Sequence, residues 1–229
     1  MVNVNNTDQR LKLAENRKKR RLEEFNDSLP SIYRHFDKNK YPRPELAEKL
    51  LNEWQNFEFD DGKETSPFNK LDCPGLILFG SPRSGKTQLA CELARQTFEK
   101  EWHTDARFIS AVQWAAETTA KAKRCDLERW TNEQLKFAWD GRCDPAIVIL
   151  DDLDKMRVSP SVQSELFNFI ETITANELRL IVTTNVSSRE LAGKFAPEFG
   201  SAIVARLQEF CVPVDFKKWQ AITEKPAEK

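Results

Sequence analysis

The stretch Gly80-Ser-Pro-Arg-Ser-Gly-Lys-Thr87 matches the phosphate-binding pattern G-x-x-x-x-G-K-[ST] without a gap. Glycines in such a loop let several backbone N–H groups point at one phosphate, and the lysine places its ammonium on the β- and γ-phosphate oxygens. The threonine hydroxyl is suited to a Mg²⁺ shell. We therefore predict that a nucleoside triphosphate is bound by Gly80, Ser81, Pro82, Arg83, Ser84, Gly85, Lys86, Thr87 and Gln88.

The segments on either side of the loop agree with this prediction. Gly75-Leu-Ile-Leu-Phe79 is apolar, as in a buried strand, and the residues after Lys86 place Leu89, Leu93 and Thr97 on one face of a helix. A helix that begins here directs the positive end of its dipole at the phosphate. An ordinary glycine-rich turn is the alternative, and it requires neither a strand before it nor a helix after it.

Two adjacent carboxylates follow a second apolar run, Ala146-Ile-Val-Ile-Leu150. Ligands of parallel sheets collect at the carboxyl ends of the strands, so acids at this strand end would face a metal and a triphosphate. In this interpretation Asp151 binds Mg²⁺, directly or through water, and Asp152 orients or deprotonates the attacking water. The alternative is that both acids only stabilise the N-terminal turn of a helix.

A third apolar run, Leu180-Ile-Val-Thr-Thr184, leads to Asn185. At the same sheet edge the amide of Asn185 can hydrogen-bond a water molecule and a phosphate oxygen. The alternative is that Asn185 caps the following helix near Ser187. Arg206 lies in a later helical segment, and local spacing does not place it on the nucleotide; a surface position is the ordinary expectation for an arginine there.

Strand-like and helix-like segments alternate from Cys73 onward. This alternation predicts an α/β fold with a parallel five-stranded sheet and helices on both of its faces. The predicted strands are 76–79, 107–110, 146–150, 179–184 and 211–214, and the predicted helices lie near 86–100, 111–123, 131–139, 160–174 and 198–208.

Residues 1–65 differ in character from the rest of the chain. A helix-compatible segment at 11–22 carries the basic cluster Arg17-Lys-Lys-Arg-Arg21, a second helix is expected at 45–54, and 60–67 look like a linker. We expect a helical N-terminal extension at 1–65, a nucleotide-binding domain at 66–219 and a charged tail at 220–229. The basic cluster is typical of contacts with nucleic acid or a partner protein, although a solvated arm explains it equally well.

The composition argues against several other functions. Five cysteines without C-x-x-C spacing and only two histidines disfavour a zinc site, a disulfide framework and Ser-His or Cys-His hydrolase chemistry. No run approaches the length of a membrane span, and the start lacks the apolar segment of a secretory signal. We therefore expect a cytoplasmic protein without membrane contact. The net charge of −1 predicts nothing about polyanionic partners.

The order of these features resembles the AAA+ ATPases. The phosphate loop, Asp151-Asp152, Thr183-Thr-Asn185, and Ala205-Arg-Leu207 before a strand follow one another as in that family. Within it the chain is similar to the DnaC-type helicase loaders and the IstB-type transposition helpers, with the DnaA-type initiators close by. The likeness covers about residues 73–216, and the stretches 85–90 and 199–207 carry most of its specificity.

The resemblance implies an ATPase that uses ATP and Mg²⁺ and forms a homo-oligomer when ATP is bound. It implies metal ligation by Thr87 and Asp151, and catalytic roles for Lys86, Asp152, Asn185 and Arg206. Asn185 would be the sensor of the γ-phosphate, and Arg206 would be an arginine finger that completes the site of the next subunit.

The resemblance also assigns contact with single-stranded DNA to the stretch 110–139. Its tryptophans, Trp114, Trp130 and Trp139, lie among the basic residues Lys121, Lys123, Arg124, Arg129 and Lys136, a mixture that can stack on bases and neutralise phosphates. Burial of each tryptophan in the core is the alternative.

Three features depart from the family pattern. Arg83 stands where the family usually has glycine, which predicts strain or a different turn in the loop. Asp152 replaces the glutamate of many loaders, as in DnaA-type proteins, and the shorter acid suggests slow, switch-like hydrolysis. The sequence ends soon after Trp219, so we expect no C-terminal lid domain.

The leading hypothesis is an ATP-dependent helicase loader that binds ATP, Mg²⁺ and single-stranded DNA and delivers a DnaB-type replicative helicase during DNA replication. An IstB-like transposition helper and a DnaA-like replication initiator or regulator have the same ATPase core. A P-loop small-molecule kinase belongs to another class and would use Asp151 as a base without a neighbouring subunit. A nucleotide-binding adaptor that no longer hydrolyses ATP is the remaining alternative.

Overall fold

A sheet of five parallel strands forms the centre of the molecule. The computed structural model describes residues 4–37, 40–42, 44–55, 75–100, 105–122, 146–176 and 178–217 of the 229-residue chain. The strands are β1 (Gly75–Phe79), β2 (Asp105–Ser110), β3 (Ala146–Asp151), β4 (Arg179–Thr184) and β5 (Cys211–Asp215). Their order across the sheet is β2-β3-β4-β1-β5.

The inner strands are buried on both faces, as expected when helices cover a parallel sheet from both sides. Ile77 of β1 lies opposite Val182 of β4, and Ile149 of β3 lies opposite Ile181 of β4. All four side chains are buried, which explains why these strands are continuous apolar runs in the sequence. The same register brings the ends of β1, β3 and β4 together at one edge of the sheet.

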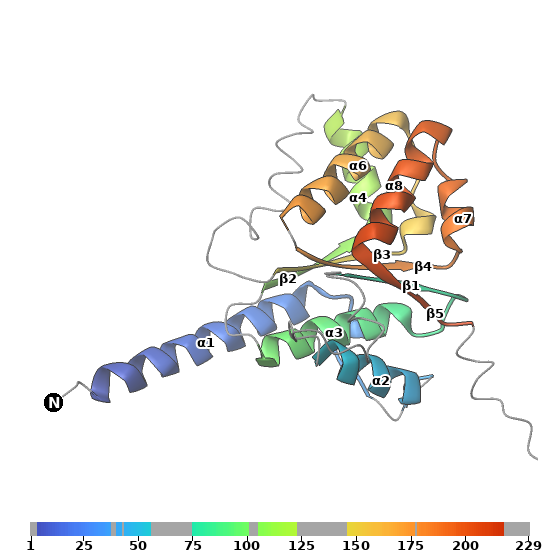
Figure 1. Ribbon diagram of the computed structural model, residues 1–229. Coiled ribbons are helices and arrows are strands. Elements are labelled where there is room, and N and C mark those ends of the chain that lie inside the picture. The colour runs from blue at the N-terminus through green and yellow to red at the C-terminus, as the bar shows by residue number, and fades with distance from the viewer. Residues whose placement is uncertain are drawn as a thin grey trace, which may run out of the picture.

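Helices lie on both faces of this sheet (Figure 1). One face is covered by α4 (Ala111–Ala122), α6 (Pro160–Ala175), α7 (Ser188–Ala192) and α8 (Pro197–Phe210), and the other by α1 (Val4–Ser28), α2 (Pro44–Gln55) and α3 (Lys86–Lys100). The N-terminal half of α1 projects beyond the rest of the molecule (Figure 1). Among the described helices, none has the length and apolar character needed to span a bilayer.

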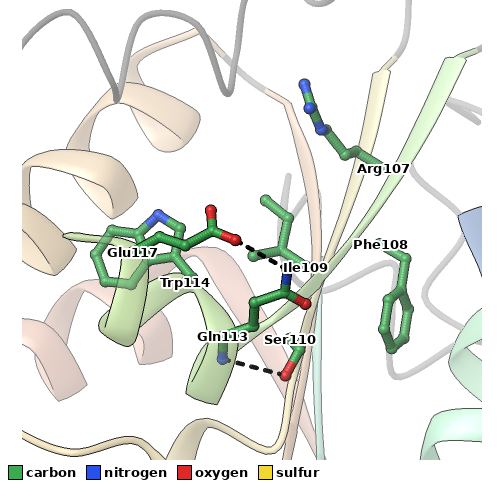
Figure 2. A pocket seen from close by; sticks show the side chains of 7 residues that line it. All are labelled: Arg107, Phe108, Ile109, Ser110, Gln113, Trp114 and Glu117. Atoms are coloured by element: carbon green, nitrogen blue, oxygen red, sulfur yellow. Dashed lines mark hydrogen bonds between the residues drawn. The ribbon is translucent and has the colours of Figure 1, made fainter. Parts of the chain in front are cut away.

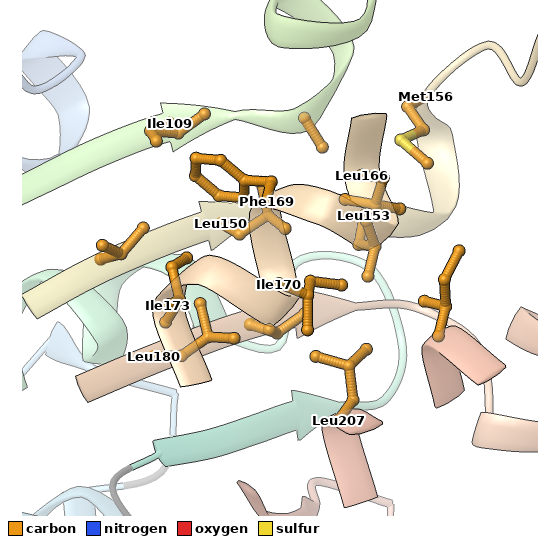
Figure 3. Close-up of a cluster of buried hydrophobic side chains, with 14 of the residues drawn as sticks. Ile109, Leu150, Leu153, Met156, Leu166, Phe169, Ile170, Ile173, Leu180 and Leu207 are labelled. Atoms are coloured by element: carbon orange, nitrogen blue, oxygen red, sulfur yellow. The ribbon is translucent and has the colours of Figure 1, made fainter. Parts of the chain in front are cut away.

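One hydrophobic cluster joins α6 and α8 to the sheet (Figure 3). Phe169 and Ile170 of α6 pack in this cluster with Leu150 of β3, Leu180 of β4 and Leu207 of α8. Each of these side chains is at most 1% exposed. Full burial of such a side chain contributes about 1.5–3 kcal/mol, so the cluster fixes α6 and α8 firmly on the sheet.

A second cluster joins the N-terminal extension to the opposite face. Phe25 of α1 contacts Phe98 of α3 with ring centroids 5.8 Å apart. Leu46 and Leu50 of α2 are buried in the same cluster as Leu89 of α3. The second half of α1 and all of α2 therefore pack on the core that supports the phosphate loop.

The predicted fold class is confirmed by this arrangement. The five strands lie within two residues of their predicted limits, helices cover both faces, and the N-terminal extension is helical. Helix α1 runs further than the predicted segment 11–22, because no proline or glycine interrupts the chain from residue 4 to 28. The predicted helix at 131–139, the linker at 60–67 and the tail at 220–229 lie outside the described residues, so the domain limits stay predictions.

Candidate functional site

The phosphate loop lies at the carboxyl edge of the sheet, between the end of β1 and the start of α3. Strand β1 is the neighbour of β4, and β4 is the neighbour of β3, so the segments that follow these strands meet at this edge. Hydrogen bonds join Lys86 and Thr87 of the loop to Asn185 and Asp151. Parallel sheets bind their ligands at this edge, and the N-terminus of α3 adds a site for an anion.

Lys86 is almost enclosed at this edge, with 5% of its surface exposed. Its ammonium donates to the main-chain oxygens of Gly80 (3.1 Å) and Ser81 (2.8 Å), to Oγ of Ser84 (3.3 Å) and to Oδ1 of Asn185 (3.0 Å). Burial lowers the pKa of Lys86, and the nearby carboxylates act in the opposite direction. An ammonium held in this way is a compact point charge suited to phosphate oxygens.

Thr87 and Asp151 form a hydroxyl and carboxylate pair. Thr87 donates to Oδ1 of Asp151 (2.7 Å), and Thr183 of β4 donates to the same oxygen (2.7 Å). Burial raises the pKa of Asp151, whereas the two hydrogen bonds from threonine lower it. A hydroxyl that donates its only hydrogen to a carboxylate can turn a lone pair toward a cation.

These oxygen atoms suit Mg²⁺ better than a softer metal, because hydroxyl and carboxylate oxygens are hard ligands. Among the described residues, no group of three or more His, Cys, Asp or Glu side chains could hold a metal by itself. Mg²⁺ commonly takes one or two protein ligands and completes its shell with water and phosphate oxygens. The residues present therefore fit Mg²⁺ that arrives together with a nucleotide.

Asn185 links Lys86 to a third acid, Asp154, which is not apparent from the sequence pattern. The backbone N–H and the Nδ2 group of Asn185 donate to Oδ1 of Asp154 at 2.8 and 3.2 Å. Ser187 is the residue that caps α7, in a capping box with Glu190. The alternative that Asn185 is a helix cap is therefore wrong.

Asp152 follows β3 in a left-handed backbone conformation, with φ 57° and ψ 45°. It occupies the N-cap position of the short helix η3 (Leu153–Lys155), although its side chain makes no capping bond to the backbone of that helix. One carboxylate oxygen accepts a hydrogen bond from Lys155 (2.6 Å), and the other lies 3.4 Å from Nδ2 of Asn185. Lys155 therefore competes with water for this carboxylate.

The backbone of the phosphate loop contains three residues with positive φ, Gly80 at 150°, Arg83 at 61° and Gly85 at 90°. The prediction of strain at Arg83 is confirmed, since a side chain in the left-handed region costs about 1–2 kcal/mol that glycine avoids. At Gly85 a Cβ atom would lie 2.6 Å from the ring of Tyr41. The Tyr41 hydroxyl also donates to the Gly85 carbonyl oxygen (3.2 Å).

The other predicted loop residues differ in exposure. Ser81 and Pro82 are exposed, as is Arg83, whereas Gly80 and Ser84 are buried and Gln88 is half-buried at the start of α3. The structure thus brings together Lys86, Thr87, Asp151, Asp152 and Asn185 beside this loop. Their individual catalytic and binding roles stay predictions.

Arg206 is not part of this assembly. It lies on α8, where its guanidinium pairs with Glu171 of α6 and with Glu209 (2.8 Å). Helix α6 runs from the carboxyl edge of the sheet back to the start of β4, and Glu171 lies near the end of this helix. The ion pair is therefore near the amino edge of the sheet, opposite the edge that carries the loop. Arg206 therefore does not reach the phosphate loop of its own chain.

Part of the predicted DNA-contacting stretch is described, namely Ser110 and α4. Trp114 is 2% exposed and packs on Phe169 with ring centroids 5.7 Å apart. It is a core residue and is not available to stack on a base. Trp130, Trp139 and the basic residues Lys123, Arg124, Arg129 and Lys136 lie outside the described residues.

A pocket of about 300 Å³ lies between β2 and α4 (Figure 2). Arg107 stands at one end of it, and Gln113 and Glu117 stand at the other. The Gln113 side chain donates to Oε1 of Glu117 (2.9 Å), so these two polar groups satisfy one another. This pocket is lined from other segments than the phosphate loop and contains none of the predicted catalytic residues.

A family model described as the ATPase family associated with various cellular activities (AAA) matches residues 76–200, more than half of the chain. The chain belongs to the AAA family of ATPases. The matched range contains the phosphate loop, Asp151, Asp152 and Asn185 and ends before Arg206. The family explains why a nucleotide loop, a strand-end acid and a polar strand tip occur together in this AAA chain.

Known relatives of this AAA chain are distant. It is 25% identical to the chromosomal replication initiator protein DnaA of Desulfotalea psychrophila over 154 residues, 67% of this chain and 30% of that protein. The structure is similar to the DnaC helicase loader, with TM-score 0.52, 21% identity and coverage of 74% of this chain and 88% of the other. It is also similar to the replication initiator DnaA bound to AMPPCP and single-stranded DNA, with TM-score 0.52, 14% identity and coverage of 80% and 53%.

The chain spans less than half the length of the curated relatives it matches. The structural likenesses have low sequence identity and therefore establish the AAA+ fold, not the substrates or partners of those proteins.

Asp154 and Tyr41 lie at the site and are not singled out by the sequence. Asp154 lies two residues after the predicted Asp152, so a search of the strand tips for further polar side chains would find it. Tyr41 reaches the loop from the N-terminal extension, and no local spacing could have placed it there.

Proposed function

We propose that this AAA ATPase is a helicase loader of the DnaC type, which binds ATP and Mg²⁺, contacts single-stranded DNA and delivers a DnaB-type replicative helicase during DNA replication. The observation that carries the proposal is that Lys86, Thr87, Asp151, Asp152 and Asn185 lie together at the phosphate loop, whereas Arg206 lies away from it in the same chain. In this proposal a second copy of the chain supplies the arginine. The likeness that extends over 88% of the DnaC helicase loader supports the same choice.

In this proposal Lys86 binds the β- and γ-phosphate oxygens, and Thr87 and Asp151 hold Mg²⁺. Mg²⁺ neutralises charge on the phosphates when it is bound. Asp152 orients the attacking water and accepts its proton, and Asn185 hydrogen-bonds that water and the γ-phosphate. Because Lys155 already occupies one oxygen of Asp152, we expect hydrolysis to be slow, as suits a switch.

Asp154 has a positioning role in the same scheme. It is 9% exposed and accepts hydrogen bonds from both the backbone and the side chain of Asn185. These bonds fix the amide so that its Nδ2 faces Asp154 and its Oδ1 faces Lys86. A γ-phosphate that draws Lys86 away would therefore remove the hydrogen bond that Oδ1 of Asn185 accepts from Lys86.

The test is delivery of a purified DnaB-type helicase onto circular single-stranded DNA, with retained helicase measured after gel filtration. We expect retention to require both the chain and ATP and to be lost in the Lys86→Ala variant. Equal retention without the chain, or without ATP, would contradict the loader proposal.

A DnaA-like initiator or regulator is the second candidate, favoured by the curated DnaA relative. It predicts ATP-dependent assembly on double-stranded DNA and no effect on helicase delivery. Measuring both on one protein preparation therefore distinguishes the two candidates. An IstB-like helper predicts stimulation of a transposase in place of a helicase. Membership of the AAA family disfavours the small-molecule kinase.

A further inference from the structure

The N-terminal extension contacts the phosphate loop through Tyr41. This residue precedes Gly85 by 44 positions, and its hydroxyl donates to the Gly85 carbonyl oxygen at 3.2 Å. Tyr41 is 3% exposed, and a Cβ atom at position 85 would lie 2.6 Å from its ring. The ring therefore packs directly on the main chain of the loop, and this close approach requires glycine at position 85.

The bond to Gly85 also determines the direction of a neighbouring N–H group. The carbonyl group of Gly85 and the backbone N–H of Lys86 belong to one peptide unit. Peptide units are planar and almost always trans, so the two bonds point in opposite directions and turn together. Leu89 of α3 donates to the same carbonyl oxygen (2.9 Å), which has one lone pair for each donor. Tyr41 and Leu89 thus hold this peptide unit from two sides.

The backbone N–H of Lys86 is a group that a phosphate can use. Lys86 is the first residue of α3, and the first N–H groups of a helix have no partner within it. In a phosphate loop such groups surround the α- and β-phosphates. A hydrogen bond at the carbonyl end of a peptide unit also polarises the N–H at its other end and strengthens it as a donor.

Tyr41 is itself held firmly by the extension. Its ring lies 5.3 Å from that of Phe36 between centroids, and both residues pack in the cluster that joins α2 to α3. At the far end of α2, Nε1 of Trp54 donates to Oγ1 of Thr97, near the end of α3 (2.9 Å). The extension is thus hydrogen-bonded to the loop before α3 and to the last turns of this helix.

We propose that Tyr41 is a positioning residue of the nucleotide site, whose hydroxyl fixes the peptide unit between Gly85 and Lys86 so that the Lys86 N–H is directed at the phosphates before a nucleotide arrives. Because Tyr41 binds the carbonyl end of this unit, it acts through the loop and does not touch the nucleotide. The proposal rests on the proposed binding of nucleotide at the loop. It makes the N-terminal extension a part of the nucleotide site, and a fragment that begins at residue 66 would lack this support.

The experiment measures AMPPCP affinity in the presence of Mg²⁺ by calorimetry, for the full chain as wild type, Tyr41→Phe and Trp54→Phe. Tyr41→Phe keeps the ring and removes the hydroxyl, and we expect it to bind about 2–10-fold more weakly, the equivalent of one hydrogen bond. Trp54→Phe is the matched control, because it removes a buried hydrogen bond between the same extension and the other end of α3. We expect both variants to unfold at lower urea concentration, but Trp54→Phe to bind AMPPCP like the wild type.

ATP turnover gives a second readout that a purely structural role would not change. We expect Tyr41→Phe to raise KM and to leave kcat unchanged, as for the loss of an interaction that holds substrate and transition state equally. Wild-type affinity in Tyr41→Phe, an equal loss of affinity in Trp54→Phe, or a lower kcat at unchanged KM overturns the role of Tyr41. If the wild type itself does not bind AMPPCP, the proposed nucleotide site fails, and the role of Tyr41 fails with it.

Discussion

At the scale of single residues, the site carries more negative than positive charge. Asp151, Asp152 and Asp154 face Lys86 and Lys155 through direct hydrogen bonds or close charges. A triphosphate would add several further negative charges to this group. A divalent cation would therefore favour phosphate binding, which agrees with the oxygen atoms of Thr87 and Asp151 as proposed ligands.

Replacement of Asp151 by asparagine distinguishes the effect of its buried charge on the stability of the fold from its proposed role in Mg²⁺ binding. Asparagine keeps an Oδ1 acceptor for Thr87 and Thr183 but removes the charge, whose burial raises the pKa of the wild-type carboxyl. We expect Asp151→Asn to have a larger free energy of unfolding than the wild type at pH 7 in the absence of ligand, because the buried charge is gone. Urea unfolding measures this, and nucleotide affinity should lose its dependence on Mg²⁺.

The sign of the pH dependence follows from the raised pKa. Protonation of Asp151 stabilises the fold below the pKa of the unfolded chain, and this contribution is lost as pH rises through the higher pKa of the folded state. The advantage of Asp151→Asn should therefore shrink as pH falls toward about 4. The exposed Asp27→Asn is a control for loss of charge, and an equal gain in that variant would contradict the assignment.

At the scale of elements, α1 has two halves with different roles. Its second half is anchored by Phe25, whereas its basic cluster is exposed or half-exposed and partly paired with acids one turn later, in Lys19–Glu23 (3.9 Å) and Arg20–Glu24 (3.3 Å). Exposed pairs of this spacing contribute about 0.3–0.5 kcal/mol each, so they stabilise the helix only slightly. The cluster can therefore exchange these partners for phosphates.

Deletion of residues 1–21 removes this cluster and leaves the end of α1, residues 22–28, with the anchoring Phe25. We expect the melting temperature to stay close to that of the wild type, while Phe25→Ala, which opens a cavity beside Phe98, costs about 3–5 kcal/mol. On single-stranded DNA, the slope of log affinity against log salt should fall by about 2–3 after the deletion. An unchanged slope, measured by fluorescence anisotropy, would show that the cluster is a solvated arm.

Local patterns predicted the strands, the phosphate loop and the strand-end acids, because each depends on neighbouring residues: apolar runs, a fixed loop spacing and the chain direction of a parallel sheet. The contacts that depend on packing between distant segments could not be predicted. Tyr41 meets Gly85 across 44 positions, and Arg206 meets Glu171 across 35. The burial of Trp114 likewise depends on how α4 lies on α6, which its sequence does not specify.

At the scale of the whole molecule, the phosphate loop and Arg206, the proposed arginine finger, lie apart in one chain. The phosphate loop is at the carboxyl edge of the sheet, and Arg206 is held by Glu171 and Glu209 on α6 and α8. If a neighbouring copy accepts Arg206, this ion pair has to exchange partners during assembly. An arginine finger raises turnover about 10³–10⁵-fold in other nucleotide hydrolases, so its absence from an isolated chain would keep hydrolysis slow.

Mixing two inactive variants tests this division. Arg206→Ala keeps an intact loop, Lys86→Ala keeps an intact Arg206, and each alone should lose ATP turnover, by about 10³-fold for Arg206→Ala. In a mixture, a loop from the first variant can meet an arginine from the second, so we expect turnover to reappear and to rise with total protein concentration. Arg206→Ala should still bind ATP, because its own loop is untouched. Full turnover by Arg206→Ala alone, or no recovery in a mixture that light scattering shows to be assembled, would mean that each chain completes its own site.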